Sequence, residues 1–195
     1  MAAARTRAPA AGNELKQGAP ADVVVFADYK QMLDLVENGN ANKDSEAVIA
    51  TNTLTLIVEK GNPLSITSLG DLASPQIRTV LCDVTQPCGK YSAQILQRSN
   101  IVVQPRSWET SVSGVTQKVA SGEADAGIVY VTDALANASK LDAVTIDKSI
   151  NVSNNYPIAA LTELSITEQK AAQTFIDFVL GNGQKILNDY GFASP

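Results

Sequence analysis

The chain has 195 residues, of which 45% are hydrophobic and 18% are charged, and its net charge is -5. At about 150 residues per domain, this length fits one large domain or two small lobes, and the apolar share is enough for a buried core. The acidic excess leaves no basic stripe for nucleic acid, and the absence of histidine excludes Ser-His-Asp and Cys-His hydrolases.

The first 20 residues differ from the rest of the chain. Residues 1–20 are rich in alanine and lack the apolar stretch of a secretory signal, so we expect a disordered leader without a visible export address. No apolar run in the sequence approaches the roughly 18 residues that a membrane span needs. The folded part is therefore expected to begin near residue 21.

From residue 21 onward, short apolar runs alternate with segments of helical periodicity. Residues 23–26 predict a buried strand, and Asp28 predicts the N-cap of the helix that follows. Ser165 with Glu168 predicts a capping box at a later helix. Further strands are expected over residues 47–59, 77–83, 101–103, 126–131, 141–147 and 156–163. Further helices are expected near residues 68, 87 and 107, and a last short helix is expected to run toward Tyr190. This alternation predicts an α/β fold with a mainly parallel sheet.

Several junctions between strands and helices are candidate binding positions. In α/β sheets, ligands bind at the carboxyl ends of the strands, where helices begin. Such junctions are expected at residues 26–28, 85–90, 110–112 and 130–133. Helix N-termini carry unpaired N–H groups and a partial positive charge, so several of them facing one cleft would hold an oxyanion. Every α/β protein has junctions of this kind and most bind nothing, so spacing by itself leaves both interpretations open.

A few single residues also allow two interpretations. Cys82 and Cys88 flank one strand end, and they would form a small disulfide in an oxidising compartment or remain inert thiols in the cytosol. Trp108 is in helical register with Val112, which favours a packing role. Tyr130 ends an apolar strand, where core packing and ligand binding are both open.

Several strings occur along the chain in an order that is typical of one protein family. They are QGAPADV at 17–23, ATNTL at 50–54, PCGKY at 87–91, GEADAGIVY at 122–130, YPI at 156–158 and YGF at 190–192. Together, over roughly residues 13–194, they resemble the molybdate-binding proteins of bacterial ABC importers. Cys88 with its partner Cys82 is similar to the actinobacterial branch of that family.

The resemblance implies a fold and a ligand. The fold would be the two-lobe type II periplasmic-binding-protein fold, with one lobe formed by residues 21–53 and 159–195 and the other by residues 54–158. A molybdate or tungstate oxyanion would bind in the cleft between the lobes through neutral hydrogen bonds, without a cofactor. The implied contacts are the backbone at Ala27, Cys88 and Val112 and the hydroxyl of Tyr130.

The resemblance also implies a role and one departure from the family. Family members begin with two serine-bearing turns that are not found before Glu14, so the first lobe is expected to be incomplete. The expected role is that of an extracytoplasmic, monomeric solute-binding protein, not an enzyme, that delivers the oxyanion to a membrane permease. The alternatives are the effector-binding domain of a transcription regulator, against which the acidic charge argues, and a truncated remnant that binds nothing.

Overall fold

The computed structural model describes Leu15 and residues 21–195, so the leader expected over residues 1–20 lies outside the described residues except for Leu15. Contacts divide the chain into two units, which we call unit 1 (residues up to Thr51, and Asn154–Pro195) and unit 2 (Asn52–Ser153). Within the described residues, no helix combines the length and the apolar character that crossing a membrane requires.

The unit boundaries differ from those expected from the sequence. In the structure, the chain passes from unit 1 to unit 2 after Thr51 and returns to unit 1 after Ser153. The sequence predicted these crossings after residues 53 and 158. The first crossing falls inside β2, which covers Ala47–Glu59, and the second follows the first residue of β7, which covers Ser153–Ala160. The apolar pattern of such a strand does not mark the residue at which its neighbours change.

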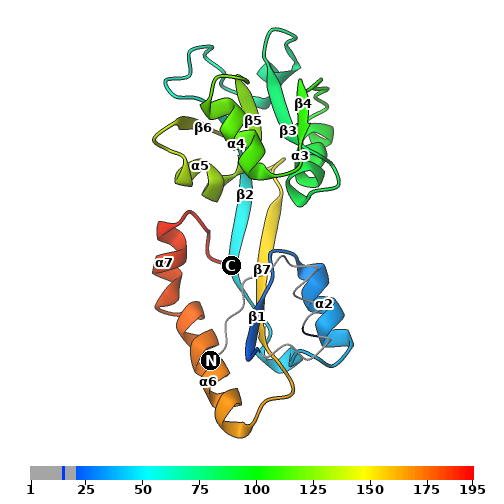
Figure 1. The fold of residues 1–195 in the computed structure, drawn as a ribbon, viewed down its shortest axis with the longest axis vertical. Helices are drawn as coiled ribbons and strands as arrows, with labels where there is room; N and C mark the ends of the chain where they lie inside the picture. Colours follow the sequence, from blue (N-terminus) through cyan, green and yellow to red (C-terminus); the bar gives the residue numbers. More distant parts are fainter. Residues whose placement is uncertain (1–14, 16–20) are drawn as a thin grey trace. The chain divides into compact units, whose positions relative to one another are not determined.

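Unit 1 is built on β1, β7 and the first part of β2. β1 runs antiparallel to β7, with Val24 opposite Ala159. Its elements are β1 (Val23–Val25), α2 (Tyr29–Glu37), the 3-10 turn Lys43–Ser45, α6 (Ile166–Leu180) and α7 (Gly183–Asp189), together with its parts of β2 and β7. Figure 1 shows α2 (blue) and α6 (orange) on opposite sides of these strands.

The two faces of the unit 1 sheet bury different helices. Successive strand residues point to opposite faces, so Ala159 packs with α2 while Ile158 packs with α6. Both expected caps are present in the structure. The Asp28 carboxylate accepts a hydrogen bond from the Lys30 N–H at 2.8 Å, and Ser165 forms the capping box with Glu168.

Unit 2 contains a mixed sheet in the order β6-β2-β5-β3-β4. Besides β2, its elements are the 3-10 helix Leu69–Ala73, β3 (Thr79–Cys82), α3 (Pro87–Arg98), β4 (Ser107–Glu109), α4 (Val112–Ala120), β5 (Ala126–Tyr130), α5 (Val131–Ala136) and β6 (Leu141–Thr145). Strands β3, β4 and β5 are parallel, whereas β2 runs antiparallel to β5 and to β6. The expectation of a mainly parallel sheet is therefore wrong, because the long β2 enters the sheet in the opposite direction.

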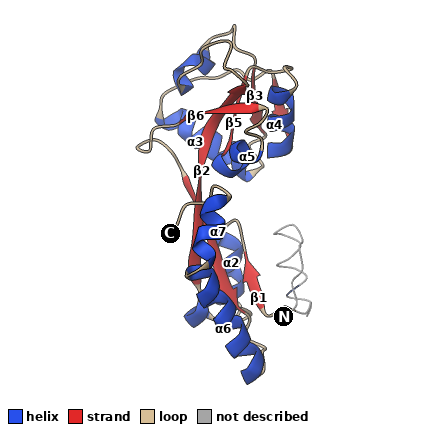
Figure 2. Ribbon diagram, turned by 90° about the vertical axis from the view of Figure 1, so that its left-hand side faces the viewer, coloured by secondary structure: helices blue, strands red, loops and turns tan. Residues whose placement is uncertain are grey.

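Helices cover both faces of the unit 2 sheet (Figure 2). On one face, Leu56, Leu81 and Ile128 pack with Ile95 of α3. On the other face, Val80 and Val129 pack with the helices α4 and α5. Buried residues on both faces fix the register of the parallel strands, because a slip by one residue would exchange the two faces.

The expected role of Trp108 is wrong. The sequence favoured a helix beginning near Ser107 that would bury Trp108, but residues 107–109 form β4 and α4 begins only at Val112. On β4, Trp108 lies opposite Leu81 of the neighbouring strand β3 and is 52% exposed. The expected strand over residues 101–103 is also absent from the described structure. The cap at Ser111 decides where the helix begins, and it separates Trp108 from the helical register of Val112.

Candidate functional site

Three helices of unit 2 begin at the same edge of its sheet. Because β3, β4 and β5 are parallel, their carboxyl ends lie at one edge, with Cys82 opposite Glu109 and Val80 opposite Gly127. Each strand leads directly into a helix, β3 into α3, β4 into α4 and β5 into α5. The free N–H groups and positive dipole ends of these helices therefore gather at one edge, an arrangement that favours an anion.

The first junction is closed by a disulfide. Cys82, the last residue of β3, and Cys88, the second residue of α3, are joined with their Cα atoms 5.8 Å apart. Both side chains are buried. The disulfide fixes the first turn of α3, which contains the backbone group of Cys88 that the sequence suggested as an oxyanion contact.

A glycine allows the first turn of α3 to approach β3 closely. A Cβ on Gly89 would lie 2.0 Å from the backbone oxygen of Asp83, whereas real Cβ atoms essentially never come within 3.0 Å of another heavy atom. Backbone atoms cannot move aside as the end of a flexible side chain can. Position 89 therefore requires glycine for a packing reason that the sequence did not reveal.

This close approach gives a testable stability prediction. We expect Gly89→Ala to lower the free energy of unfolding by about 1–3 kcal/mol, the usual range for overpacking, because α3 or the Asp83 backbone must shift. Gly70→Ala is the matched control, since the nearest atom to its new Cβ is the Ser68 Oγ at 3.4 Å. Chemical denaturation of both variants measures the difference, and equal stabilities would contradict the close approach.

The second and third junctions have different caps. Ser111 caps α4, and its Oγ accepts a hydrogen bond from the Gly114 N–H at 3.2 Å, so the half-buried Val112 is the first helical residue. At α5, the N-cap is the half-buried Tyr130 itself. Burial raises the pKa of the Asp133 carboxyl, although a hydrogen bond from the Tyr130 backbone opposes the rise.

Sequence reasoning missed Asn52 as a residue of this edge. Asn52 is 2% exposed, and its Nδ2 donates a hydrogen bond to the Oγ1 of Thr132 at 2.9 Å, which ties β2 to the first turn of α5. The available signal was a polar residue inside a strand whose buried neighbours are apolar. A fully buried amide usually has a structural partner.

The remaining candidate, Ala27, lies in unit 1. It is exposed at the junction between β1 and α2, and its carbonyl accepts a hydrogen bond from the Asn154 Nδ2 at 2.6 Å. The structure therefore brings Cys88, Val112 and Tyr130 to one edge of unit 2, while Ala27 occupies an equivalent strand-to-helix junction of unit 1.

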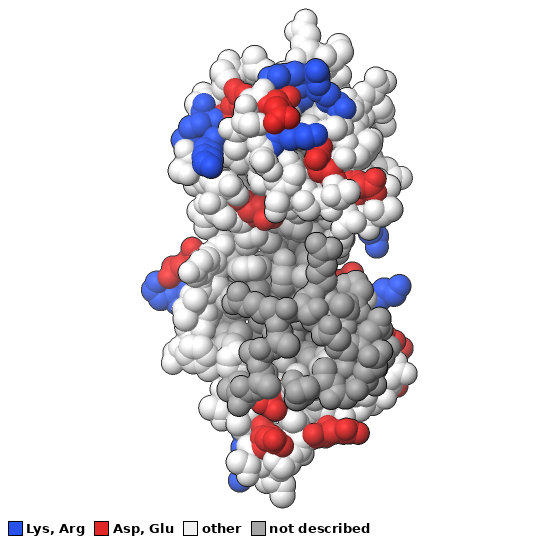
Figure 3. Space-filling view, in the orientation of Figure 1, with Lys and Arg blue, Asp and Glu red and all other residues white. Residues whose placement is uncertain are grey.

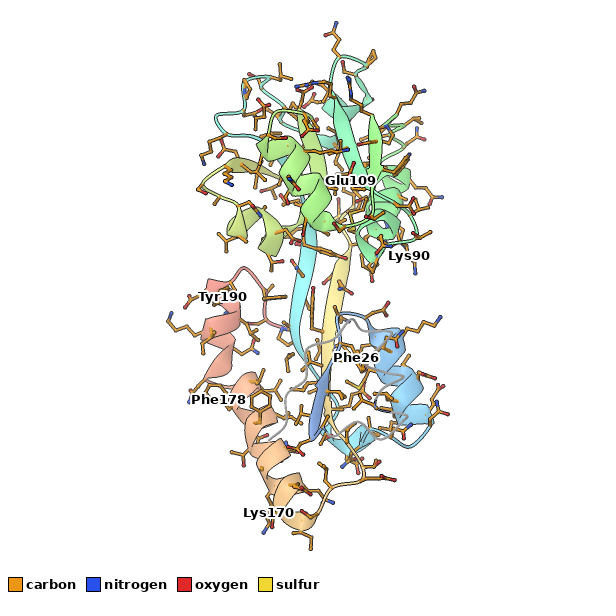
Figure 4. The ribbon with its side chains drawn as sticks, in the orientation of Figure 1. Phe26, Lys90, Glu109, Lys170, Phe178 and Tyr190 are labelled. Carbon is orange, nitrogen blue, oxygen red and sulfur yellow. A yellow bond between two sulfur atoms is a disulfide. The ribbon has the colours of Figure 1, made fainter. Side chains whose placement is uncertain are left out.

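Side chains of both charges occur on the surface of unit 2. On the face of unit 2 shown in Figure 3, Lys and Arg are interspersed with Asp and Glu. Glu109 at the end of β4 and Lys90 in the first turn of α3 both belong to unit 2 (Figure 4). Among the described residues, no group of His, Cys, Asp or Glu could hold a metal ion.

Comparison with known proteins places the chain in a family. The profile of the bacterial extracellular solute-binding proteins matches residues 3–193. The molybdate-binding protein ModA of Mycobacterium tuberculosis is 39% identical over 183 residues, which cover 93% of this chain and 69% of that protein.

Solved structures agree on the fold. A substrate binding domain from Clostridium difficile, assigned to a molybdenum ABC transporter, matches with a TM-score of 0.84 and 27% identity, covering 97% of this chain and 84% of that one. The periplasmic molybdate-binding protein of Azotobacter vinelandii shares the fold with a TM-score of 0.75 at 19% identity, covering 97% of this chain and 85% of that one. The chain therefore belongs to the bacterial extracellular solute-binding proteins and, among them, to the molybdate-binding protein ModA family, a family of binding proteins and not of enzymes.

Proposed function

We propose that this protein is the substrate-binding component of a molybdate ABC transporter. It binds molybdate or tungstate outside the cytoplasm as a monomer and delivers the oxyanion to a membrane permease. The observation that carries the proposal is the edge of unit 2 at which α3, α4 and α5 all begin. The 39% identity to the M. tuberculosis ModA protein supports the choice of ligand.

The proposed binding mode uses neutral hydrogen-bond donors at the starts of helices. The backbone N–H groups of Ala27, Cys88 and Val112 and the hydroxyl of Tyr130 donate to the oxyanion. Groups at helix N-termini suit a dianion, because their N–H bonds already point outward and no desolvated cation is required. Such donors select a fully ionised tetrahedral oxyanion, since every oxygen can accept a hydrogen bond and none has to donate one.

Calorimetric titration of the whole chain with molybdate, tungstate, sulfate and phosphate tests the proposal. We expect molybdate and tungstate to bind with a stoichiometry of one and to exclude each other in competition. Sulfate is expected to bind more weakly, because its shorter bonds to oxygen leave the donors further from their acceptors. No binding of either molybdate or tungstate would overturn the proposed function.

A further inference from the structure

The edge at which the three helices begin also carries a carboxylate. Glu109 is the last residue of β4, directly opposite Cys82 in the register, and its side chain is only 15% exposed. Its carboxylate packs against the first turn of α4, since a Cβ on Gly114 would lie 3.1 Å from the Glu109 Oε2. Glycine inside a helix is less favourable than alanine, and here it makes room for this carboxylate.

A carboxylate at this position would oppose anion binding. Val112, two residues before Gly114, is the first residue of α4 and one of the proposed oxyanion contacts. The positive end of the helix dipole acts mainly over the first turn, and the Glu109 carboxylate packs against that same turn. A dianion at Val112 would therefore be repelled by Glu109 unless another group balanced its charge.

Lys118 supplies the opposite charge. Its Nζ lies 2.6 Å from the Glu109 Oε1 and donates a second hydrogen bond to the Ser107 Oγ at 3.0 Å. The Ser107 hydroxyl in turn donates to the same Oε1 at 2.6 Å. The Lys118 side chain is 32% exposed, so this ion pair is less screened by solvent than a fully exposed pair. These hydrogen bonds, first from Lys118 and then from Ser107, hold the pKa of Glu109 below its ordinary value.

We propose that Lys118 is an electrostatic positioning residue of the oxyanion site. By pairing with Glu109, it cancels the negative charge beside the first turn of α4 and so allows a dianion to bind at Val112. The cation comes from the last turn of the same helix, where it also favours the helix dipole. The other charged residues of these junctions are Asp83, Lys90 and Asp133. They are the same in the wild type and in a Lys118 variant, so a difference in affinity between the two reports on Lys118. This inference rests on the proposed function.

Charge rescue provides the test, measured as molybdate affinity by calorimetry. We expect Lys118→Met to weaken binding about tenfold, the order of magnitude for one uncompensated charge acting on a dianion through a partly screened medium. The double variant Lys118→Met with Glu109→Gln is expected to bind within about threefold of wild type. Lys118→Arg, which keeps the charge, is expected to bind like wild type.

Lys60→Met is the matched control. It removes a lysine from another 2.6 Å ion pair of unit 2, with Asp142. Lys60 follows the end of β2, and since Val58 pairs with the first residue of β5, it lies at the opposite edge of the sheet. Molybdate affinity is therefore expected to be unchanged in Lys60→Met. Thermal denaturation of every variant identifies any loss of affinity that is caused by unfolding.

The outcomes separate this inference from the proposed function. Wild-type affinity in Lys118→Met would overturn the inference and leave the proposed function intact. Weak binding that Glu109→Gln does not rescue would also overturn it, because the ion pair would then act only on structure. A wild-type protein that binds no molybdate or tungstate would overturn both.

Discussion

Tyr130→Phe is expected to weaken molybdate binding by about one to two orders of magnitude. The substitution removes one hydroxyl that we propose to donate to the oxyanion, and a hydrogen bond to a charged group contributes about 1.5–3 kcal/mol. The ring of Tyr130 packs against both core clusters of unit 2, and phenylalanine preserves that packing. Calorimetry with molybdate measures the change.

The control for this variant is Tyr190→Phe. Tyr190 follows α7 in unit 1, is 71% exposed and is not among the proposed contacts (Figure 4). We expect this variant to bind molybdate as the wild type does. If Tyr130→Phe binds equally well, Tyr130 is only a core residue and the proposed binding mode is wrong at that position.

Removing the disulfide with Cys82→Ala and Cys88→Ala is expected to cost about 2 kcal/mol of folding stability. A bridge between residues separated by 6 positions closes a short loop, and the chain-entropy relation gives about this value for so short a loop. Because the bridge also fixes the first turn of α3, we expect molybdate binding to weaken in the same variant. Chemical denaturation and calorimetry measure the two effects.

Thiol counting on the denatured, non-reduced protein provides the control for this experiment. Protein made in an oxidising compartment is expected to have no free thiol, and the alanine variant provides the blank. Two free thiols in the wild type would show that the bridge does not form. A bridged wild type with the stability and affinity of the alanine variant would mean that the bridge does not hold the first turn of α3.

Local sequence signals predicted the start of a helix well where a single capping residue determines it. A side chain that can accept from the backbone two or three residues later specifies a helix start, and Asp28 and Ser165 both do so. Trp108 shows where such reasoning failed. Its spacing to Val112 matched a helix, but the cap at Ser111 begins the helix after Trp108.

The sequence by itself determined the α/β class, the strand-to-helix junctions and the resemblance to molybdate-binding proteins. These depend on periodicity, caps and short strings, all of which act over a few neighbouring residues. The sequence pattern also pointed to Cys88, Val112 and Tyr130 as residues at such junctions. It could not determine the direction of β2, which makes the sheet of unit 2 mixed.

Only the tertiary structure determined which residues meet across the sheet. The parallel register places Cys82 beside Glu109, and close packing requires glycine at position 89. The hydrogen bond from Asn52 to Thr132 joins residues that are 80 positions apart. Contacts of this kind depend on how strands pair and how helices pack on them, and a local pattern of apolar and polar residues is compatible with many such pairings.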